Sequence, residues 1–306
     1  MSGTQHTETV ALIALLQMHD SRWAKVREEL EEQPASKLLR GRIAPTLLDE
    51  EFGAVLSNAS EQLHSWEEQR MRVVTPYSSD YPSQLRAVHD FPPLLFARGH
   101  FDDEDANSVA IVGTRTPSTG ALRFIDELVP LLAADRISIV SGLAKGVDGA
   151  AMTRSLEAGN RTVGIIGTGL NVSYPRENAT LQSWVADEHL LISQFWPDAP
   201  PSKQSFPMRN HVMSAYSGMT LIVEASENSG TRIQARAATK HGRPLILSKA
   251  VYLQTKWAKD LVAQRFDVRV VSSAREALEA VKDIRRRRLS RATWVEAGLS
   301  LSEKSA

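Results

Sequence analysis

The sequence predicts an α/β protein in which an open, doubly wound, mostly parallel sheet is preceded by a small helical domain. Short apolar runs recur after residue 108, and runs that are apolar on both faces are typical of strands covered on both sides. Most of them are followed by a helical stretch, which indicates parallel strands joined by crossovers. Seven runs favour an open sheet over an eightfold barrel. The runs are VAIVG (109–113), ISIVSG (137–142), TVGIIG (162–167), LLISQ (190–194), TLIVEA (220–225), PLILS (244–248) and VRVVS (268–272).

Three regions are expected along the chain. Residues 1–70 form the small helical domain, because apolar residues recur at helical spacing over 10–32 and again from about 46 to 68. Residues 71–284 form the main α/β domain. Their first part, 71–105, is rich in proline and is expected to contain extended segments and turns. Residues 285–306 form a basic C-terminal tail.

Composition excludes several classes of protein. The 306 residues contain no cysteine, so disulfides, thiolate metal sites and cysteine nucleophiles are excluded. The eight histidines show no ligand spacing, and we predict neither a metal nor a cofactor. No apolar run reaches membrane-spanning length and no signal peptide is evident, so a soluble cytoplasmic protein is expected. The net charge is zero, so any site for a polyanion must be local.

The C-terminal region opens with the capping-box pattern Ser273-x-x-Glu276, which predicts a helix start. Cations in a last helical turn suit the helix dipole, but this run contains more arginines than that role needs. A solvated tail and an auxiliary polyanion contact remain equally open. The arginines are Arg285, Arg286, Arg287, Arg288 and Arg291.

Five loops at predicted strand ends carry the candidate chemistry, because small residues and cations there suit phosphate binding near helix N-termini. The candidate phosphate-binding residues are Gly113, Thr114, Arg115 and Ser118 in the first loop, Ser141, Gly142 and Lys145 in the second, Lys203, Phe206, Arg209 and Asn210 in the fourth, and Ser229, Gly230 and Thr231 in the fifth. The third loop, residues 167–178, contains Gly-x-Gly, which taken alone is more typical of a bare turn.

The loops favour a phosphate-rich ligand without specifying a nucleotide. Neither the dinucleotide fingerprint nor the P-loop is present. Phe206, between Lys203 and Arg209, matches the pattern expected where one base is stacked and its phosphates are held. The many loops suit an oligonucleotide at least as well as one nucleotide.

The order of motifs resembles the DNA-processing protein A family (DprA, also called Smf). The motifs are YPSQLRAVHDFPPLLFARG, IVGTR, SGLAKGVD, IIGTGLNVSYPREN, FPMRN and EASENSGT, over roughly residues 75–247. The resemblance implies an extended Rossmann-like domain that binds single-stranded DNA without catalysis. It also implies a homodimer that helps to load a RecA-type recombinase in DNA uptake or recombination, with Lys203 and Arg209 on the DNA backbone and Phe206 near a base.

The chain departs from the family pattern at several positions. Met152, Gln194 and His211 stand where the family usually has His, Glu and Arg. The Pro-Gly after the sixth strand is absent, and no winged-helix domain follows in this sequence. A divergent member is therefore expected, with the dimer surface and the RecA contact in question, and with a role in phage defence or a toxin–antitoxin pair as a further option.

Two alternatives on the same fold remain open. One is a sensor of a signalling nucleotide. The other is a nucleotide phosphoribohydrolase of the related lysine-decarboxylase-like class, whose signature places a catalytic Glu where this chain has Gln234. Since an amide cannot act as a carboxylate base, the second alternative is the weaker one.

Overall fold

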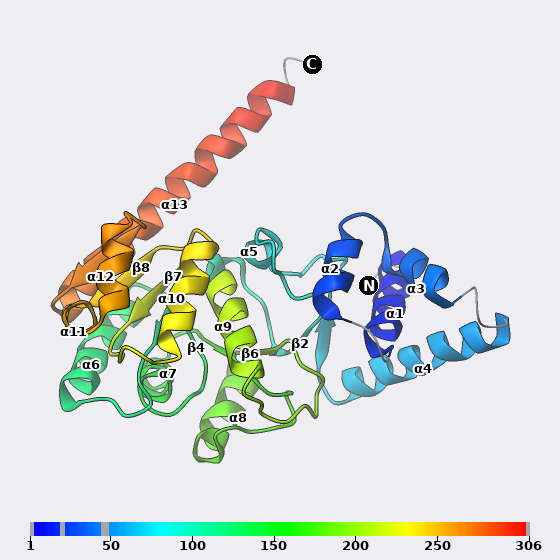
Figure 1. Ribbon diagram of the computed structural model, residues 1–306, viewed down its shortest axis with the longest axis horizontal. Helices are drawn as coiled ribbons and strands as arrows, with labels where there is room; N and C mark the ends of the chain where they lie inside the picture. Colours follow the sequence, from blue (N-terminus) through cyan, green and yellow to red (C-terminus); the bar gives the residue numbers. More distant parts are fainter. Residues whose placement is uncertain (1–2, 19–21, 44–48, 304–306) are drawn as a thin grey trace.

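The computed structural model describes residues 3–18, 22–43 and 49–303, and it contains one nine-stranded sheet with helices on both faces (Figure 1). The strand order is β1-β2-β6-β5-β4-β3-β7-β8-β9. Strands β3 to β9 run parallel to one another, whereas β2 runs antiparallel to both of its neighbours, β1 and β6. The predicted doubly wound, mostly parallel sheet is confirmed.

The bounds of the strands are β1 (Arg72–Val74), β2 (Leu95–Gly99), β3 (Val109–Val112), β4 (Ile139–Ser141), β5 (Thr162–Ile165), β6 (Leu190–Ser193), β7 (Met219–Ile222), β8 (Leu245–Ser248) and β9 (Val268–Val271). Each of the seven predicted runs contains or overlaps one of β3 to β9. Strands β1 and β2 lie in the segment that we expected to hold only extended pieces and turns. They add an antiparallel pair at one side of the sheet, which the proline-rich sequence of this segment did not reveal.

The bounds of the helices are α1 (Gly3–Gln17), α2 (Trp23–Leu30), α3 (Ala35–Ile43), α4 (Asp49–Glu68), α5 (Ser83–Arg86), α6 (Thr119–Ala134), α7 (Val147–Glu157), α8 (Ala179–Glu188), α9 (Ser205–Tyr216), α10 (Thr231–Lys240), α11 (Lys249–Gln254), α12 (Lys256–Ala263) and α13 (Ala274–Glu303), with 3-10 helices η1 (Asp103–Asn107) and η2 (Arg176–Asn178). The start predicted for the fourth helix, near residue 46, lies outside the described residues.

The central strands are apolar on both faces because helices cover each side. Val109 and Ile111 of β3 pack in one buried cluster with residues of α6, α7 and α13. Ala110 and Val112 of the same strand pack in another cluster with residues of α9, α10, α11 and α12. Since successive side chains of a strand point to opposite faces, this alternation places one helical layer on each side of the sheet.

The N-terminal helices share a core with the antiparallel edge of the sheet. A single buried cluster joins α1, α3 and α4 to β1, β2 and α8. Trp66 of α4 stacks on Trp196, with ring centroids 5.6 Å apart, and meets Phe96 of β2 edge to face at 5.0 Å. The helical region therefore packs directly against the α/β body at one end of the molecule (Figure 1).

Helix α13 lies at the other end of the sheet and extends away from the body (Figure 1). Its start has the capping predicted from the sequence: Ser273 Oγ accepts from the backbone N–H of Glu276 at 3.2 Å, and the Glu276 carboxylate accepts from the N–H of Ser272 at 2.8 Å. The boundary proposed at residue 285 falls inside this continuous helix. No helix among the described residues is both long and apolar enough to cross a membrane.

Candidate functional site

The candidate site lies where the strand order reverses. The chain proceeds from β3 outward through β4 and β5 to β6, whereas β7, β8 and β9 extend the sheet on the other side of β3. The loops that leave β3 and β7 therefore diverge, and such switch points at the carboxyl ends of parallel strands are where ligands bind.

A pocket of about 290 Å³ opens at this point. A smaller pocket adjoins it, and the two share Arg115, Phe206 and Arg209 in their walls. Of the predicted residues, Gly113, Thr114, Arg115, Phe206, Arg209, Asn210, Ser229, Gly230 and Thr231 line the first pocket, and Gly142 and Lys145 line the second. The structure thus brings together four of the five loops selected from the sequence, and residues of the third loop complete the second pocket.

The remaining three predicted residues lie outside these two pockets. Ser141 Oγ is buried and donates to the carbonyl of Ile111 at 2.7 Å, which is a link between neighbouring strands. Ser118 caps α6, with its Oγ accepting from the N–H of Ala121 at 3.2 Å. Lys203 is exposed in the segment before α9.

The loop after β3 is held rigidly by its neighbours. The N–H of Thr114 donates to the carbonyl of Glu224 at 2.8 Å, and the carbonyl of Thr114 accepts from Val147 at 3.1 Å. The Glu224 carboxylate accepts from the N–H of Ser118 at 2.8 Å. A Cβ at Gly113 would lie 2.9 Å from the Glu224 carbonyl and closer still to Val147, so only glycine fits there without displacing backbone.

A buried ion pair lies beneath the site. Arg209 and Asp148 have side chains that are 6% and 7% exposed, and Arg209 Nη1 lies 3.8 Å from an Asp148 oxygen. The same nitrogen donates to the carbonyl of Ile165 at 3.3 Å. A Cβ on Gly142 would lie 1.0 Å from this nitrogen, so Gly142 is the residue that makes room for the guanidinium.

The Asp148 carboxylate occupies backbone donors that the sequence suggested for phosphate. Burial raises the pKa of Asp148, while the charge of Arg209 and hydrogen bonds from the N–H groups of Gly142, Gly113 and Ala144 oppose that rise. Burial likewise lowers the pKa of Arg209, against the charge of Asp148. The N–H groups of Gly113 and Gly142 therefore bond the Asp148 carboxylate. The Arg209 side chain is 6% exposed, whereas the motif implied an exposed contact with the DNA backbone.

The exposed part of the site places Arg115 beside two aromatic rings. Arg115 is exposed, and its guanidinium carbon lies 5.7 Å from the centroid of the Phe206 ring. The Phe206 ring also lies beside the ring of Tyr174, with ring centroids 5.4 Å apart and an interplanar angle of 38°. Tyr174 is 38% exposed. Tyr174 was not selected from the sequence, although it stands in the third loop, next to Pro175.

The fifth loop and the first turns of α10 contribute two buried side-chain oxygens that lack partners among the described residues. No side chain among the described residues caps α10, which begins at Thr231. Ser229 Oγ and Gln234 Oε1 line this region of the pocket and are buried, yet neither has a hydrogen-bond partner among the described residues. Polar atoms in this state are normally satisfied by water or a ligand.

Comparison with known proteins agrees with this geometry. Residues 72–282 match the family described as DNA recombination-mediator protein A. The chain belongs to this family.

Curated relatives in the family include the DNA processing protein DprA of Bacillus subtilis, which is 33% identical over 219 residues, covering 69% of this chain and 74% of the relative. The DprA of Streptococcus pneumoniae is 37% identical over 163 residues, covering 53% and 57%. The chain thus spans about three quarters of one relative and little more than half of the other.

Two solved structures extend the comparison. The X-ray structure of DprA from Streptococcus pneumoniae aligns with a TM-score of 0.69 at 27% identity, covering 91% of this chain and 98% of that one. The second structure describes the single-stranded DNA binding mode of DNA processing protein A from Helicobacter pylori. It aligns with a TM-score of 0.60 at 25% identity, covering 70% of this chain and 96% of that one.

Arg285 and Arg288 of α13 contact the protein away from the pocket. Arg288 donates to the carbonyls of Gly218 and Ala106, which precede β7 and β3, at 3.1 and 3.2 Å. Arg285 lies 3.7 Å from Glu104 in η1. These contacts are at the amino ends of the strands, opposite the candidate site. The auxiliary polyanion contact suggested for the arginine run stays a prediction.

The other arginines of the run have similar partners or fall outside the description. Arg287 lies 3.2 Å from Asp283 and 3.6 Å from Asp267, and Arg286 lies 3.9 Å from Asp283. The side chain of Arg291 lies outside the described residues. The run therefore contributes ion pairs within the protein, which a sequence pattern of consecutive arginines does not show.

Proposed function

We propose that the chain is a non-catalytic protein that binds single-stranded DNA at the carboxyl ends of β3, β4 and β7. The observation that carries this proposal is the cation–aromatic row of Arg115, Phe206 and Tyr174 at the mouth of the pocket. Aromatic faces stack on bases with little sequence preference, while a neighbouring guanidinium holds the phosphate backbone.

The charges around this row support a backbone-binding role. Lys145 is exposed, lines the second pocket together with Arg115 and forms an ion pair with Glu177. A polyanion would compete with Glu177 for Lys145. Site sizes of other single-strand binders suggest about 6–10 nucleotides for each protomer.

Binding without catalysis is supported by Gln234 and Asp148 of the pocket wall, because both side chains are buried and each already has a polar partner. Gln234, which stands where a hydrolase of the related class has its Glu, is 1% exposed, and its amide donates to Thr220 at 3.4 Å. Asp148, the acid in the pocket wall, is buried against Arg209. A buried carboxylate that is already paired and hydrogen-bonded is poorly placed to accept a proton from substrate.

We further propose that the protein acts as a homodimer beside a RecA-type recombinase in recombination or DNA uptake, with phage defence or a toxin–antitoxin pair as a specialised setting. The family description as a recombination mediator supports this role. The DNA-binding mode named for the Helicobacter pylori relative supports the choice of single-stranded DNA. Light scattering would measure the oligomeric state, and recombinase loading on coated strands would measure the mediator activity.

Substitution of the two rings tests the DNA-binding proposal. Phe206→Ala and Tyr174→Ala should each weaken binding of a single strand by about 1–3 kcal/mol, the range for one stacked base. Phe266→Ala is the matched control, because Phe266 is 41% exposed, lines neither pocket and precedes the edge strand β9. Equal affinity of both ring variants and the control, measured by fluorescence anisotropy with folded proteins, would refute the proposal.

A further inference from the structure

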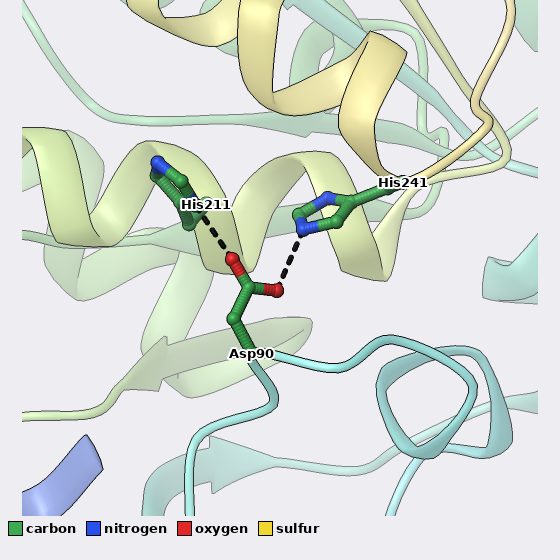
Figure 2. Close-up of side chains that lie close together, drawn as sticks. All are labelled: Asp90, His211 and His241. Carbon is green, nitrogen blue, oxygen red and sulfur yellow. Dashed lines mark hydrogen bonds and ion pairs between the residues drawn. The ribbon is translucent and has the colours of Figure 1, made fainter.

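Three side chains with metal-ligating atoms meet on the face of the sheet covered by α9 and α10 (Figure 2). Asp90 lies in the segment between α5 and β2, His211 lies in α9, and His241 directly follows α10. An Asp90 oxygen lies 2.8 Å from Nδ1 of His211, and the other lies 2.7 Å from Nε2 of His241.

No sequence pattern predicts this cluster. His211 and His241 are 121 and 151 residues from Asp90 in the chain, so no local ligand spacing exists. His211 also stands where the related motif usually has Arg. Only the packing of α9 against α10 and of both against the segment before β2 brings the three together.

The donor set suits one divalent metal ion. The ligand atoms of the three side chains all lie within 4.8 Å of one another. Two imidazoles and a carboxylate are a typical protein ligand set for Zn²⁺, with bonds of about 2.0–2.2 Å. Tetrahedral bonds of that length put ligand atoms roughly 3.3 Å apart. The two hydrogen-bonded contacts would therefore widen by about half an ångström, and any ligand pair at the 4.8 Å limit would close by about 1.5 Å.

The surroundings of His241 orient it as a ligand. Its side chain is fully buried, and its Nδ1 lies 2.9 Å from Ser214 Oγ. When Nε2 binds a metal, Nδ1–H donates to this hydroxyl, and such a second hydrogen bond fixes the ring of most metal-bound histidines. The side chains of Asp90 and His211 are 19% and 34% exposed, which leaves a solvent-facing path for the ion and a position for a bound water.

We propose that Asp90, His211 and His241 form a Zn²⁺ site that ties α9 and α10 to the segment preceding β2. The site lies apart from the pocket, because none of its three residues lines that pocket. Its consequence for the pocket is mechanical. Helix α9 carries Phe206 and Arg209, and α10 begins at the pocket, so a bound ion would hold both helices in the arrangement described above.

The test uses the untagged full chain, freed of metal by a chelator and titrated with Zn²⁺ in competition with a chromophoric chelator. The expected result is one Zn²⁺ for each chain. Ser214→Ala should weaken Zn²⁺ binding about 10–100-fold, the usual effect of removing an outer hydrogen bond, and His211→Gln should weaken it more. Substitution with Co²⁺ should give the visible spectrum of tetrahedral cobalt in the wild-type chain and lose it in His211→Gln.

His64→Gln is the matched control, because the His64 side chain is 74% exposed on α4 and lies outside the cluster. It should bind Zn²⁺ as the wild-type chain does. His211 is partly exposed, so its replacement is expected to fold, and Asp90→Asn provides a second variant whose fold is checked by circular dichroism. Absence of stoichiometric Zn²⁺ binding in the wild-type chain, or wild-type affinity in both His211→Gln and Asp90→Asn, would overturn the proposal.

Discussion

The buried pair beneath the pocket yields a sharp prediction. Arg209→Leu leaves the Asp148 carboxylate buried without its counter-charge. The charges are 3.8 Å apart, and at an effective dielectric constant of about 20 this separation corresponds to about 4 kcal/mol. Breaking a buried pair by removing one partner costs about 3–5 kcal/mol, which agrees. Chemical unfolding followed by tryptophan fluorescence should therefore show a free energy of unfolding lowered by about that amount.

The pH dependence of this loss has a definite sign. Burial raises the pKa of Asp148 in the folded chain, and removal of Arg209 raises it further. A carboxyl whose folded pKa exceeds its unfolded value binds more protons when folded, so its penalty is largest at neutral pH. The loss in Arg209→Leu should shrink as the pH falls toward the ordinary value of 3.8, and adding Asp148→Asn should restore much of the stability at pH 7.

Arg154→Leu is the matched control for this experiment. Arg154 pairs with Asp126 and Glu157, but its side chain is 47% exposed, so its replacement should cost far less stability than Arg209→Leu, because solvent screens exposed ion pairs. A cost below about 1 kcal/mol for Arg209→Leu, or equal costs for the two variants, would refute the view that the Arg209–Asp148 pair supports the site from within.

Four further predictions concern the same region. Arg115→Ala should weaken single-strand binding for every sequence and reduce the salt slope by about 0.7, one phosphate contact, in an anisotropy titration. Glu177→Gln should strengthen strand binding at low salt, because Lys145 loses its competing carboxylate; weaker binding would contradict this. Gly142→Ala should lower the free energy of unfolding by about 1–3 kcal/mol, since the new Cβ displaces the guanidinium beneath it, and unchanged stability would contradict the packing described. Arg288→Ala should leave strand affinity unchanged at every salt concentration, because its guanidinium bonds carbonyls at the opposite edge of the sheet.

The sequence predicted the sheet well because its central strands are buried on both faces. Each apolar run from 109 to 272 corresponds to a parallel strand, and the small-residue loops lie at the strand ends, as expected. Strands β1 and β2 were not predicted as members of the sheet, because they lie in a proline-rich segment and β2 joins the sheet by pairing antiparallel with β6, which is distant in the chain.

The sequence predicted which loops form the site, but not which of their residues are exposed to a ligand and which are buried beneath it. Residue types selected Arg115 and Phe206 as candidates in two separate loops, and in the structure the guanidinium carbon of Arg115 lies 5.7 Å from the centroid of the Phe206 ring. That Arg209 is buried depends on the space left by Gly142 and on Asp148, which sequence spacing does not reveal. The ion pairs of the arginine run in α13 were not predicted either, because Arg285 and Arg287 meet Glu104 and Asp267, which lie outside the run.

The most direct test of single-strand binding is fluorescence anisotropy with labelled single strands of increasing length, against a duplex and against mononucleotides, at several salt concentrations. We expect affinity to rise with strand length, to fall with salt and to exceed that for the duplex, since a row of cations and rings follows an extended backbone. Saturable binding of a mononucleotide, without binding of any strand, would contradict the account and indicate a nucleotide sensor or hydrolase on the same fold.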